Sequence, residues 1–235
     1  MKISIIIPVL DDVTLLAKQL ARLQQWRSQG HEVIVVDGGG EDTDAAAAVA
    51  KTLADRFLAS PPGRAIQMNL GADQARGEIL LFLHVDTILP TDAWLLVQDA
   101  LHGGVADWGR FDVRLSGRFW MFRIIERCMN LRSAVTRIAT GDQAIFVRRR
   151  CFDKAGGFPA IALMEDIAIS KRLRRISRPA RIRQVAVTSS RRWEQHGILR
   201  TVLLMWWLRF SYFCGASPQY LAGKYYGTTP GPGER

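Results

Sequence analysis

Cysteine and long apolar stretches are scarce in this sequence, and each scarcity excludes a class of protein. The three cysteines, Cys128, Cys151 and Cys214, are scattered and include no C-x-x-C pair, so neither a disulfide framework nor a zinc site is indicated. The aromatic helix pattern near the C-terminus has only eight uncharged residues between Arg200 and Arg209. That length is far short of the ~20 residues needed to cross a bilayer.

Two phosphate-binding fingerprints and a targeting segment are also missing. Neither G-x-G-x-x-G nor G-x-x-x-x-G-K-[ST] occurs, so the usual dinucleotide site and P-loop are excluded. Residues 1–9 are too short for a signal peptide, and Asp11 and Asp12 follow them at once. We therefore expect a reducing, cytoplasmic compartment.

The charge of the chain is carried by arginine. Six lysines and 26 arginines give a net charge of +10, and 21 of the arginines follow position 100. The planar guanidinium suits two-pronged contacts to phosphate. An anionic partner is therefore expected: a nucleotide, a phosphorylated substrate, a nucleic acid or an acidic membrane surface. A solvated basic face would give the same composition.

The stretch I-L-L-F-L-H-V-D-T, residues 79–87, organises the chain. Its unbroken apolar run is typical of a strand buried on both faces of a parallel sheet. Asp86 then lies at the carboxyl end of that strand, where open α/β sheets bind ligands. His84 and Asp86 could hold a divalent ion. Alternatively, Asp86 or Thr87 caps the following helix.

The first ninety residues repeat this arrangement. Apolar runs at 3–9 and 32–36 each lead to acids, and 56–59 is a short third strand candidate. Helical patterns separate them, so we expect an α/β fold with a mostly parallel, right-handed central sheet and flanking helices. Asp37, before three glycines, can accept a hydrogen bond from a base N–H or a ribose hydroxyl.

The second half alternates strand and helix patterns less regularly. Residues 105–115 alternate loosely around Trp108, Phe111 and Val113, strands are predicted at 144–147 and 181–189, and a helix is predicted at 116–135. Glu165 and Asp166 open a further helix, either as a general base site or as favourable charges at a helix N-terminus.

The end of the chain combines basic, aromatic and flexible segments. Arg191 and Arg192 beside Trp193 suit a pyrophosphate and a stacked group, and His196 is either a third metal ligand or a surface histidine. Residues 198–214 form a helix with a wide aromatic face: a docking helix, a dimer interface, a membrane-surface helix or simple core packing. We predict a domain at 1–197, a helical appendage at 198–227 and a disordered tail at 228–235.

Five motifs in order resemble the family-two glycosyltransferases with a GT-A fold. They are I-I-I-P-V-L-D-D, V-V-D-G-G-G-E-D-T, L-F-L-H-V-D-T, G-G-F-P with L-M-E-D-I, and R-R-W. The resemblance covers residues 3–197. It implies a nucleoside-diphosphate-sugar donor, usually carrying UDP, a divalent ion (Mg²⁺ or Mn²⁺) and inversion at the anomeric carbon.

The same resemblance implies residue roles. The donor would contact Pro8, Asp12, Asp37, Arg64, Asp86, Arg110, Asp142 and Trp193, and the catalytic group would be Asp166 with Glu165 and Arg192. His84 replaces the first aspartate of the D-x-D metal motif, so Asp86 would be the main ligand, assisted by His84 and His196. Ser189 stands where a Q-x-x-R-W motif has glutamine.

Other segments resemble a narrower soluble subgroup, named for arsenosugar biosynthesis or for association with selenium genes. They include G-R-A-x-Q-M-N-x-G-A, W-G-R-F-D-V, T-G-D-Q and R-R-W-E-x-H-G. The subgroup includes the selenosugar synthases of selenoneine biosynthesis, which join selenophosphate to a sugar from UDP-N-acetylglucosamine or UDP-glucose. Arg64, Arg110 and Arg192 would then hold the anionic acceptor. A hydroxyl or lipid-phosphate acceptor at a membrane is the alternative, and a basic nucleic-acid-binding protein is the alternative of another class.

Overall fold

The apolar runs of the first half form four parallel strands. These are β1 (Ile3–Val9), β2 (Glu32–Asp37), β3 (Arg56–Ala59) and β4 (Ile79–Phe82). β1 lies between β2 and β4, and β3 lies outside β2. Every residue of β1, β2 and β4 is buried, as their near-continuous apolar composition predicts. The computed structural model describes residues 1–227, apart from the side chain of Arg192; the predicted disordered tail at 228–235 lies outside the described residues.

The second half extends the same sheet. β5 (Trp108–Leu115), β6 (Phe146–Arg148) and β7 (Ala180–Thr188) complete the order β3-β2-β1-β4-β6-β5-β7. β6 is antiparallel to both β4 and β5, whereas β5 and β7 are parallel. The predicted mostly parallel α/β sheet is therefore confirmed.

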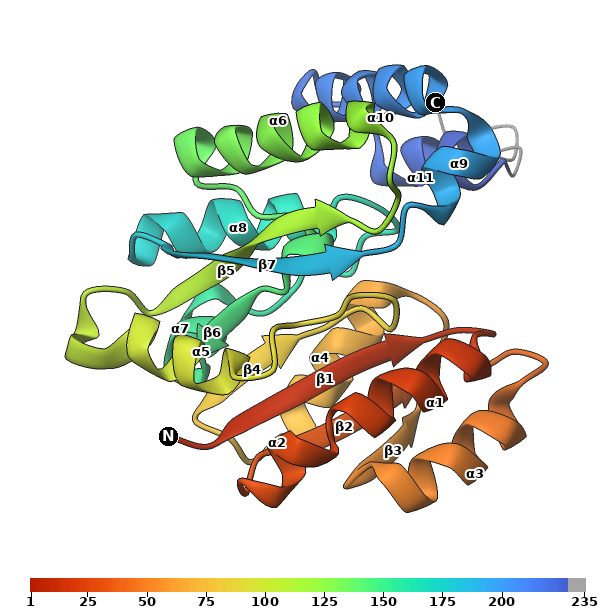
Figure 1. Cartoon of the computed structure of the whole chain (residues 1–235). Helices are drawn as coiled ribbons and strands as arrows, with labels where there is room; N and C mark the ends of the chain where they lie inside the picture. The colour runs from red at the N-terminus through yellow and green to blue at the C-terminus, as the bar shows by residue number, and fades with distance from the viewer. Residues whose placement is uncertain (228–235) are drawn as a thin grey trace.

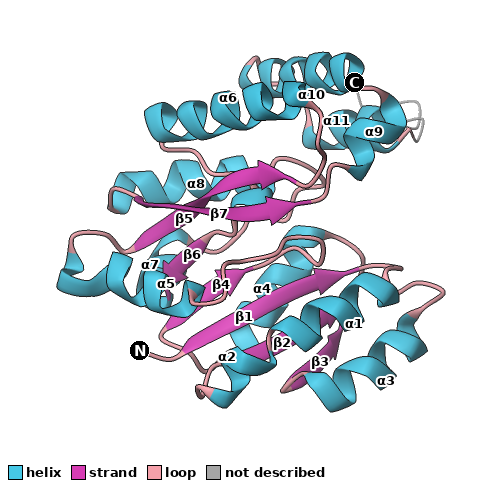
Figure 2. Ribbon diagram, in the orientation of Figure 1, coloured by secondary structure: helices cyan, strands magenta, loops and turns pink. Residues whose placement is uncertain are grey.

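Helices cover both faces of the sheet (Figures 1 and 2). On one face α1 (Val13–Arg22), α3 (Thr43–Leu53) and α5 (Ala93–Leu101) pack on the odd-numbered side chains of β1. On the other face lie α4 (Arg64–Gln74), α7 (Arg149–Ala155) and α8 (Glu165–Ile176). The shorter α2 (Gln24–Ser28) follows α1, and the 3₁₀ turns η1 (His102–Gly104) and η2 (Gly141–Gln143) precede β5 and β6.

Close packing fixes the position of α4. A Cβ atom at Gly71 would lie 2.5 Å from Cγ2 of Ile6 on β1, so only glycine lets the helix approach the sheet this closely. The N-terminus of α4, which carries Arg64, is thereby held at the edge where the parallel strands end.

The remaining helices gather beyond the β5–β7 end of the sheet, as Figure 1 shows. They are α6 (Trp120–Thr136), α9 (Arg191–His196), α10 (Ile198–Phe213) and α11 (Pro218–Tyr226). Leu208 of α10 and Leu221 of α11 pack with Met164 and Ile167 at the start of α8. Core packing thus explains one side of α10.

The other side of α10 is apolar and exposed. Leu203, Trp206 and Phe210 are each about two-thirds exposed, at 65%, 66% and 69%. Across residues 1–227, every helix is too short or too polar to traverse a bilayer.

Candidate active site

The sheet topology brings residues from distant parts of the chain to one edge. β1, β2 and β4 are parallel, so the residues that follow them share that edge. β6 runs the opposite way, so the residues before it arrive at the same edge. His84, after β4, therefore meets Asp142, before β6: Nδ1 of His84 lies 3.5 Å from Oδ1 of Asp142.

The end of β2 carries a pre-organised carboxylate. Asp37 is only 2% exposed, and its Oδ2 accepts a hydrogen bond of 2.6 Å from Oγ1 of Thr43. The adjoining turn requires glycine at position 40, because φ is 159° there and a Cβ atom would collide with the Asp11 carboxylate. The side-chain amide of Gln67 donates to the carbonyls of Val9 and Val36, each at 2.8 Å, and so joins the ends of β1 and β2.

The end of β1 meets the basic helix α9. Asp12 caps α1 by accepting a 3.3 Å hydrogen bond from the amide of Leu15, and its Oδ2 lies 3.5 Å from Nη2 of Arg191. Pro8 is buried within β1, and Trp193 is partly buried on α9. The predicted nucleotide residues of β1 and β2 and the segment at 189–197 therefore lie along one side of the site.

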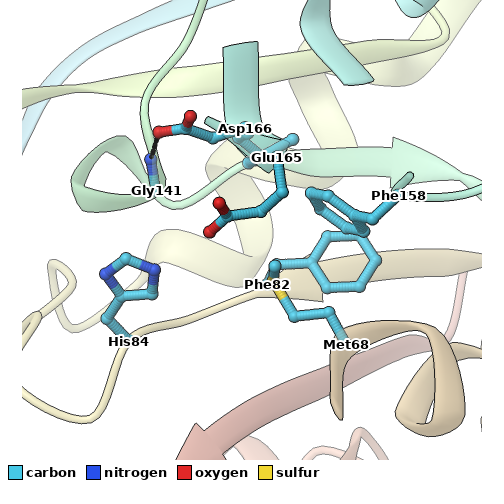
Figure 3. Close-up of a pocket in the computed structure, with 8 residues that line it drawn as sticks. Met68, Phe82, His84, Gly141, Phe158, Glu165 and Asp166 are labelled. Atoms are coloured by element: carbon cyan, nitrogen blue, oxygen red, sulfur yellow. Dashed lines mark hydrogen bonds between the residues drawn. The ribbon is translucent and has the colours of Figure 1, made fainter. Parts of the chain in front are cut away.

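A small pocket in the middle of this edge contains both candidate catalytic acids. Its lining comprises Met68, Phe82, His84, Gly141, Ile145, Phe158, Glu165 and Asp166. Figure 3 shows the Glu165 carboxylate pointing toward His84, with its stem beside Phe82 and Phe158. Oδ2 of Asp166 instead accepts a 3.0 Å hydrogen bond from the amide of Gly141. Met164 precedes the two acids with a left-handed backbone, φ 71°, a strained conformation of the kind that clusters at functional sites.

Burial and mutual repulsion tune the acids of this pocket. Burial, followed by repulsion from Asp166, raises the pKa of Glu165 to about 7. Burial also raises the pKa of Asp86, helped by Asp142 and opposed by His84 and Arg64. Burial favours the neutral form of Asp142, yet its hydrogen bond with His84 and the charges around it hold its pKa below the usual value. A carboxyl group with a pKa near neutrality suits proton transfer.

Few side chains at this edge are placed to bind a divalent ion. Within residues 1–227, no group of three or more His, Cys, Asp or Glu side chains is arranged to hold a metal ion. Asp86 and His84 still fit an ion that is shared with substrate, because Mg²⁺ is commonly bound by one or two carboxylates together with phosphate oxygens. His196 is exposed at the end of α9, and the structure does not bring it into a ligand group with Asp86 and His84.

The predicted arginines have different environments. Arg110 is only 3% exposed, and its Nη1 donates to Oδ1 of Asp112 at 2.7 Å and to the carbonyl of Phe111 at 3.1 Å. Its charge is thus neutralised within β5, away from the pocket lining. Arg64 is exposed at the start of α4 and lies within electrostatic reach of Glu165 and Asp142. The side chain of Arg192 is outside the described part of the structure.

Two arginines that were not singled out in the sequence lie close to the site. Arg132 of α6 and Arg209 of α10 both interact electrostatically with Asp142 and Asp166. The signal for Arg209 was a charge inside the aromatic stretch M-W-W-L-R-F. Arg132 gave no signal, because arginine is common throughout that segment.

The seven-stranded, mostly parallel sheet with helices on both faces is a fold of GT-A type. The family model Glycosyl transferase family 2 matches residues 4–164, which is well over half of the chain. The chain belongs to glycosyl transferase family 2, and the predicted family is confirmed. The comparison with curated proteins found no match.

Solved structures share the fold at low sequence identity. A 1–349 fragment of Staphylococcus aureus TarS is 19% identical with a TM-score of 0.62, over 81% of this chain and 61% of the fragment. The mannosyltransferase PcManGT of Pyrobaculum calidifontis, in complex with GDP-Man and Mn²⁺, is 21% identical with a TM-score of 0.59, over 79% and 56%. The glucosyl-3-phosphoglycerate synthase of Mycobacterium tuberculosis, in complex with Mn²⁺, UDP and glucosyl-3-phosphoglycerate, is 16% identical with a TM-score of 0.57, over 80% and 71%. The chain thus spans about three-fifths of the first two structures.

Proposed function

We propose that the chain transfers a sugar from UDP-N-acetylglucosamine or UDP-glucose to selenophosphate, with inversion at the anomeric carbon. The observation that carries this proposal is that His84 lines one pocket with Glu165 and Asp166, while Asp86 lies within electrostatic reach of His84. Family membership supports the nucleotide-sugar donor. TarS has also been solved with UDP-GlcNAc; the choice of UDP over GDP rests on the narrower resemblance of the motifs.

The donor would lie along the ends of β1 and β2. Asp37 would accept the N–H of uracil, and Pro8 and Asp12 would line the base and ribose pocket. The diphosphate would lie at Asp86 and His84, with Arg64 and Arg192 as cationic neighbours. A divalent ion bound by Asp86 and His84 would neutralise the leaving diphosphate.

The transfer itself exchanges one bond for another. The selenium of selenophosphate attacks the anomeric carbon from the face opposite the diphosphate. The carbon–oxygen bond to the β-phosphate breaks, and UDP leaves with the bonding electron pair. Hydrolysis of the selenium–phosphorus bond then yields the 1-seleno-sugar and phosphate. Since selenophosphate arrives deprotonated, Asp166 would orient the reactants, and Glu165 would not be required as a base.

Mass spectrometry of the products tests this proposal. The wild-type protein is incubated with each UDP-sugar, selenophosphate and Mg²⁺ or Mn²⁺, beside an Asp86→Ala control. We expect UDP and a selenium-containing sugar from the wild type alone. Sugar transfer to hydroxyl acceptors, with selenophosphate left unchanged, would contradict the proposed acceptor.

A second acceptor is favoured by one observation, the exposed aromatic side of α10. Trp206, Phe210 and Phe213 could contact a membrane surface, where a lipid phosphate or another hydroxyl compound would be the acceptor. The same face could join two copies of the chain. Flotation with phosphatidylcholine vesicles tests the membrane contact, with Trp206→Ser and Phe210→Ser variants as controls.

We also propose a cytoplasmic location and a transferase domain at 1–197 with an appendage at 198–227. The three cysteines support the location: Cys128, Cys151 and Cys214 are all unpaired, as is usual in a reducing compartment.

A further inference from the structure

Two arginines near Asp166 have no anionic partner among residues 1–227. Nε and Nη2 of Arg132 are buried and make no hydrogen bond. Arg209 is partly buried. Among the residues that the structure describes, neither guanidinium forms an ion pair within 4.0 Å.

This arrangement is unfavourable in the protein alone. A buried charge normally acquires a partner, because its lost hydration must be replaced. Burial, followed by repulsion from Arg209, lowers the pKa of Arg132 to about 10. Two cations that repel each other in a partly desolvated space are stabilised when an anion binds between them.

Other arginines of the second half differ from this pair. Arg110 and Arg181 both bind Asp112, each with an N–O distance of 2.7 Å. Arg123 pairs with Glu126 at 3.0 Å, and Arg150 pairs with Asp107 at 2.8 Å. Several arginines near Arg132 in the sequence form ion pairs with acids. The excess of arginine over acid therefore does not by itself explain why Arg132 has no ion pair.

The acids nearest to the pair are already engaged. Asp166 accepts from the amides of Gly141 and Ile167, at 3.0 and 2.6 Å. Asp142 lies 3.5 Å from His84. Their charges attract Arg132 and Arg209 without closing a salt bridge, and the guanidinium donors remain available beside the reaction centre.

The third apolar cluster holds Arg209 in this position. Leu208 is fully buried against the start of α8, the helix that opens with Glu165 and Asp166. The next residue, Arg209, is thereby fixed close to Asp166, and Arg132 approaches from α6 on the β5 side. The C-terminal helix thus contributes a charged group to the active site.

We propose that Arg132 and Arg209 bind the oxyanion of the acceptor, a phosphate-type group, on the side of Asp166 remote from Asp37. Two guanidinium forks can hold a tetrahedral dianion through paired hydrogen bonds. That this anion is the acceptor rests on the proposed function. The phosphate could belong to a small ion or to a lipid head group, which share this chemistry.

Calorimetry with inorganic thiophosphate tests the site directly. Thiophosphate is titrated into the full chain, with and without saturating UDP, for the wild type, Arg132→Gln and Arg209→Gln. We expect each substitution to weaken thiophosphate binding by ~10–100-fold, the usual effect of losing hydrogen bonds to a charged group. UDP affinity should change less than about twofold.

Matched controls come from the same two helices. Arg127 of α6 and Arg200 of α10 are exposed, so Arg127→Gln and Arg200→Gln make the same change in net charge outside the site. They should leave thiophosphate binding within about twofold of wild type. Arg132→Lys keeps the charge without the fork and should bind with intermediate affinity, which guards against a loss caused by misfolding.

The two proposals fail in different ways. Equal weakening by the controls and the site variants, or no saturable thiophosphate binding by the wild type, overturns the oxyanion site. Absence of UDP binding by a wild type that binds thiophosphate through Arg132 overturns the proposed donor alone. Vesicles of phosphatidylcholine with and without phosphatidic acid distinguish the sources: flotation that requires both phosphatidic acid and Arg132 identifies a lipid phosphate, and thiophosphate binding without flotation identifies a small ion.

Discussion

The two sides of the candidate active site differ in whether their charged side chains have hydrogen-bond partners within the protein. On the side of β1 and β2, Asp37 is buried and already accepts a hydrogen bond from Thr43, and Gln67 ties the two strand ends together. On the side of α6 and α10, Arg132 is half-buried, and its Nε and Nη2 atoms are buried without a hydrogen-bond partner among the described residues. The polar groups of the first side are held by hydrogen bonds within the protein, whereas two guanidinium nitrogens of the second side have no partner among the described residues.

This difference has a structural origin. The first side is built from consecutive strand–helix units, so its polar groups are fixed by local turns next to the strands. The second side is assembled by helices that dock from distant parts of the chain, α6 on β5 and α10 on α8. We infer that the first side binds the nucleotide-sugar donor, the type of substrate common to the family. We infer that the second side determines which acceptor is used.

The largest expected effect follows loss of the carboxylate between the two sides. Asp86→Ala should reduce transfer by ~10³-fold or more, because the divalent ion proposed to neutralise the leaving diphosphate would lose its main protein ligand. Product formation is measured at saturating donor and acceptor. The variant should keep its thiophosphate affinity, which separates the centre from the acceptor side. Activity persisting in the variant, or in the wild type after exhaustive chelation, would show that arginines alone neutralise the diphosphate.

A smaller effect is expected on the nucleotide side. Asp37→Ala should weaken UDP binding by about 1–3 kcal/mol, the cost of leaving a buried partner unsatisfied. Calorimetry measures this change, with Asp44→Ala as a control, because Asp44 is an exposed acid at the start of α3, the helix that follows Asp37 in the chain. Unchanged UDP affinity in a folded Asp37→Ala variant would remove Asp37 from the nucleotide site.

The effect of Asp166→Asn depends on the acceptor. With selenophosphate, which needs no base, the rate should fall by less than ~10-fold; a hydroxyl acceptor would bring the ~10²–10⁴-fold loss typical of a missing general base. Rates are compared with selenophosphate and thiophosphate as acceptors. A loss in the full general-base range, together with unchanged acceptor KM in Arg132→Gln, would refute the anionic acceptor.

A further prediction concerns stability rather than activity. The pKa of Glu165 is raised to about 7 in the folded protein. As pH rises, the Glu165 carboxyl therefore ionises in the unfolded protein before it ionises in the folded one. The free energy of unfolding should therefore fall between about pH 4.5 and pH 7. Glu165→Gln should reduce this fall, measured by urea denaturation at pH 5 and pH 8, by about 1–3 kcal/mol. The exposed Glu78→Gln is the control, and an identical fall in both variants would contradict the shifted pKa.

The sequence predicted well the strands and the functional residues that directly follow them. It predicted poorly the residues whose position depends on how distant helices pack against the sheet. The strand predicted at 3–9 was found with those bounds, since a buried parallel strand has a continuous apolar signature. The strand predicted at 144–147 begins later, at Phe146, because Ala144 adopts a left-handed backbone with φ 48° that ends η2.

The candidate site shows the same division. His84 and Asp166 were predicted from their motifs, and the structure brings both into one pocket. Arg110 was predicted to hold the acceptor, yet the structure pairs it with Asp112. Arg132 was missed, because its distance from Asp166 is set by how α6 packs on β5, and no local pattern reports that packing.

The most direct test of the division between the two sides is a kinetic comparison of Asp37→Ala with Arg132→Gln. Donor and acceptor concentrations are varied separately, and both KM values are determined for each variant. The account predicts crossed effects of ~10-fold or more: Asp37→Ala raises the donor KM and leaves the acceptor KM within twofold, and Arg132→Gln does the reverse. If both variants raise the same KM, the nucleotide and the acceptor oxyanion are not bound on opposite sides of the site.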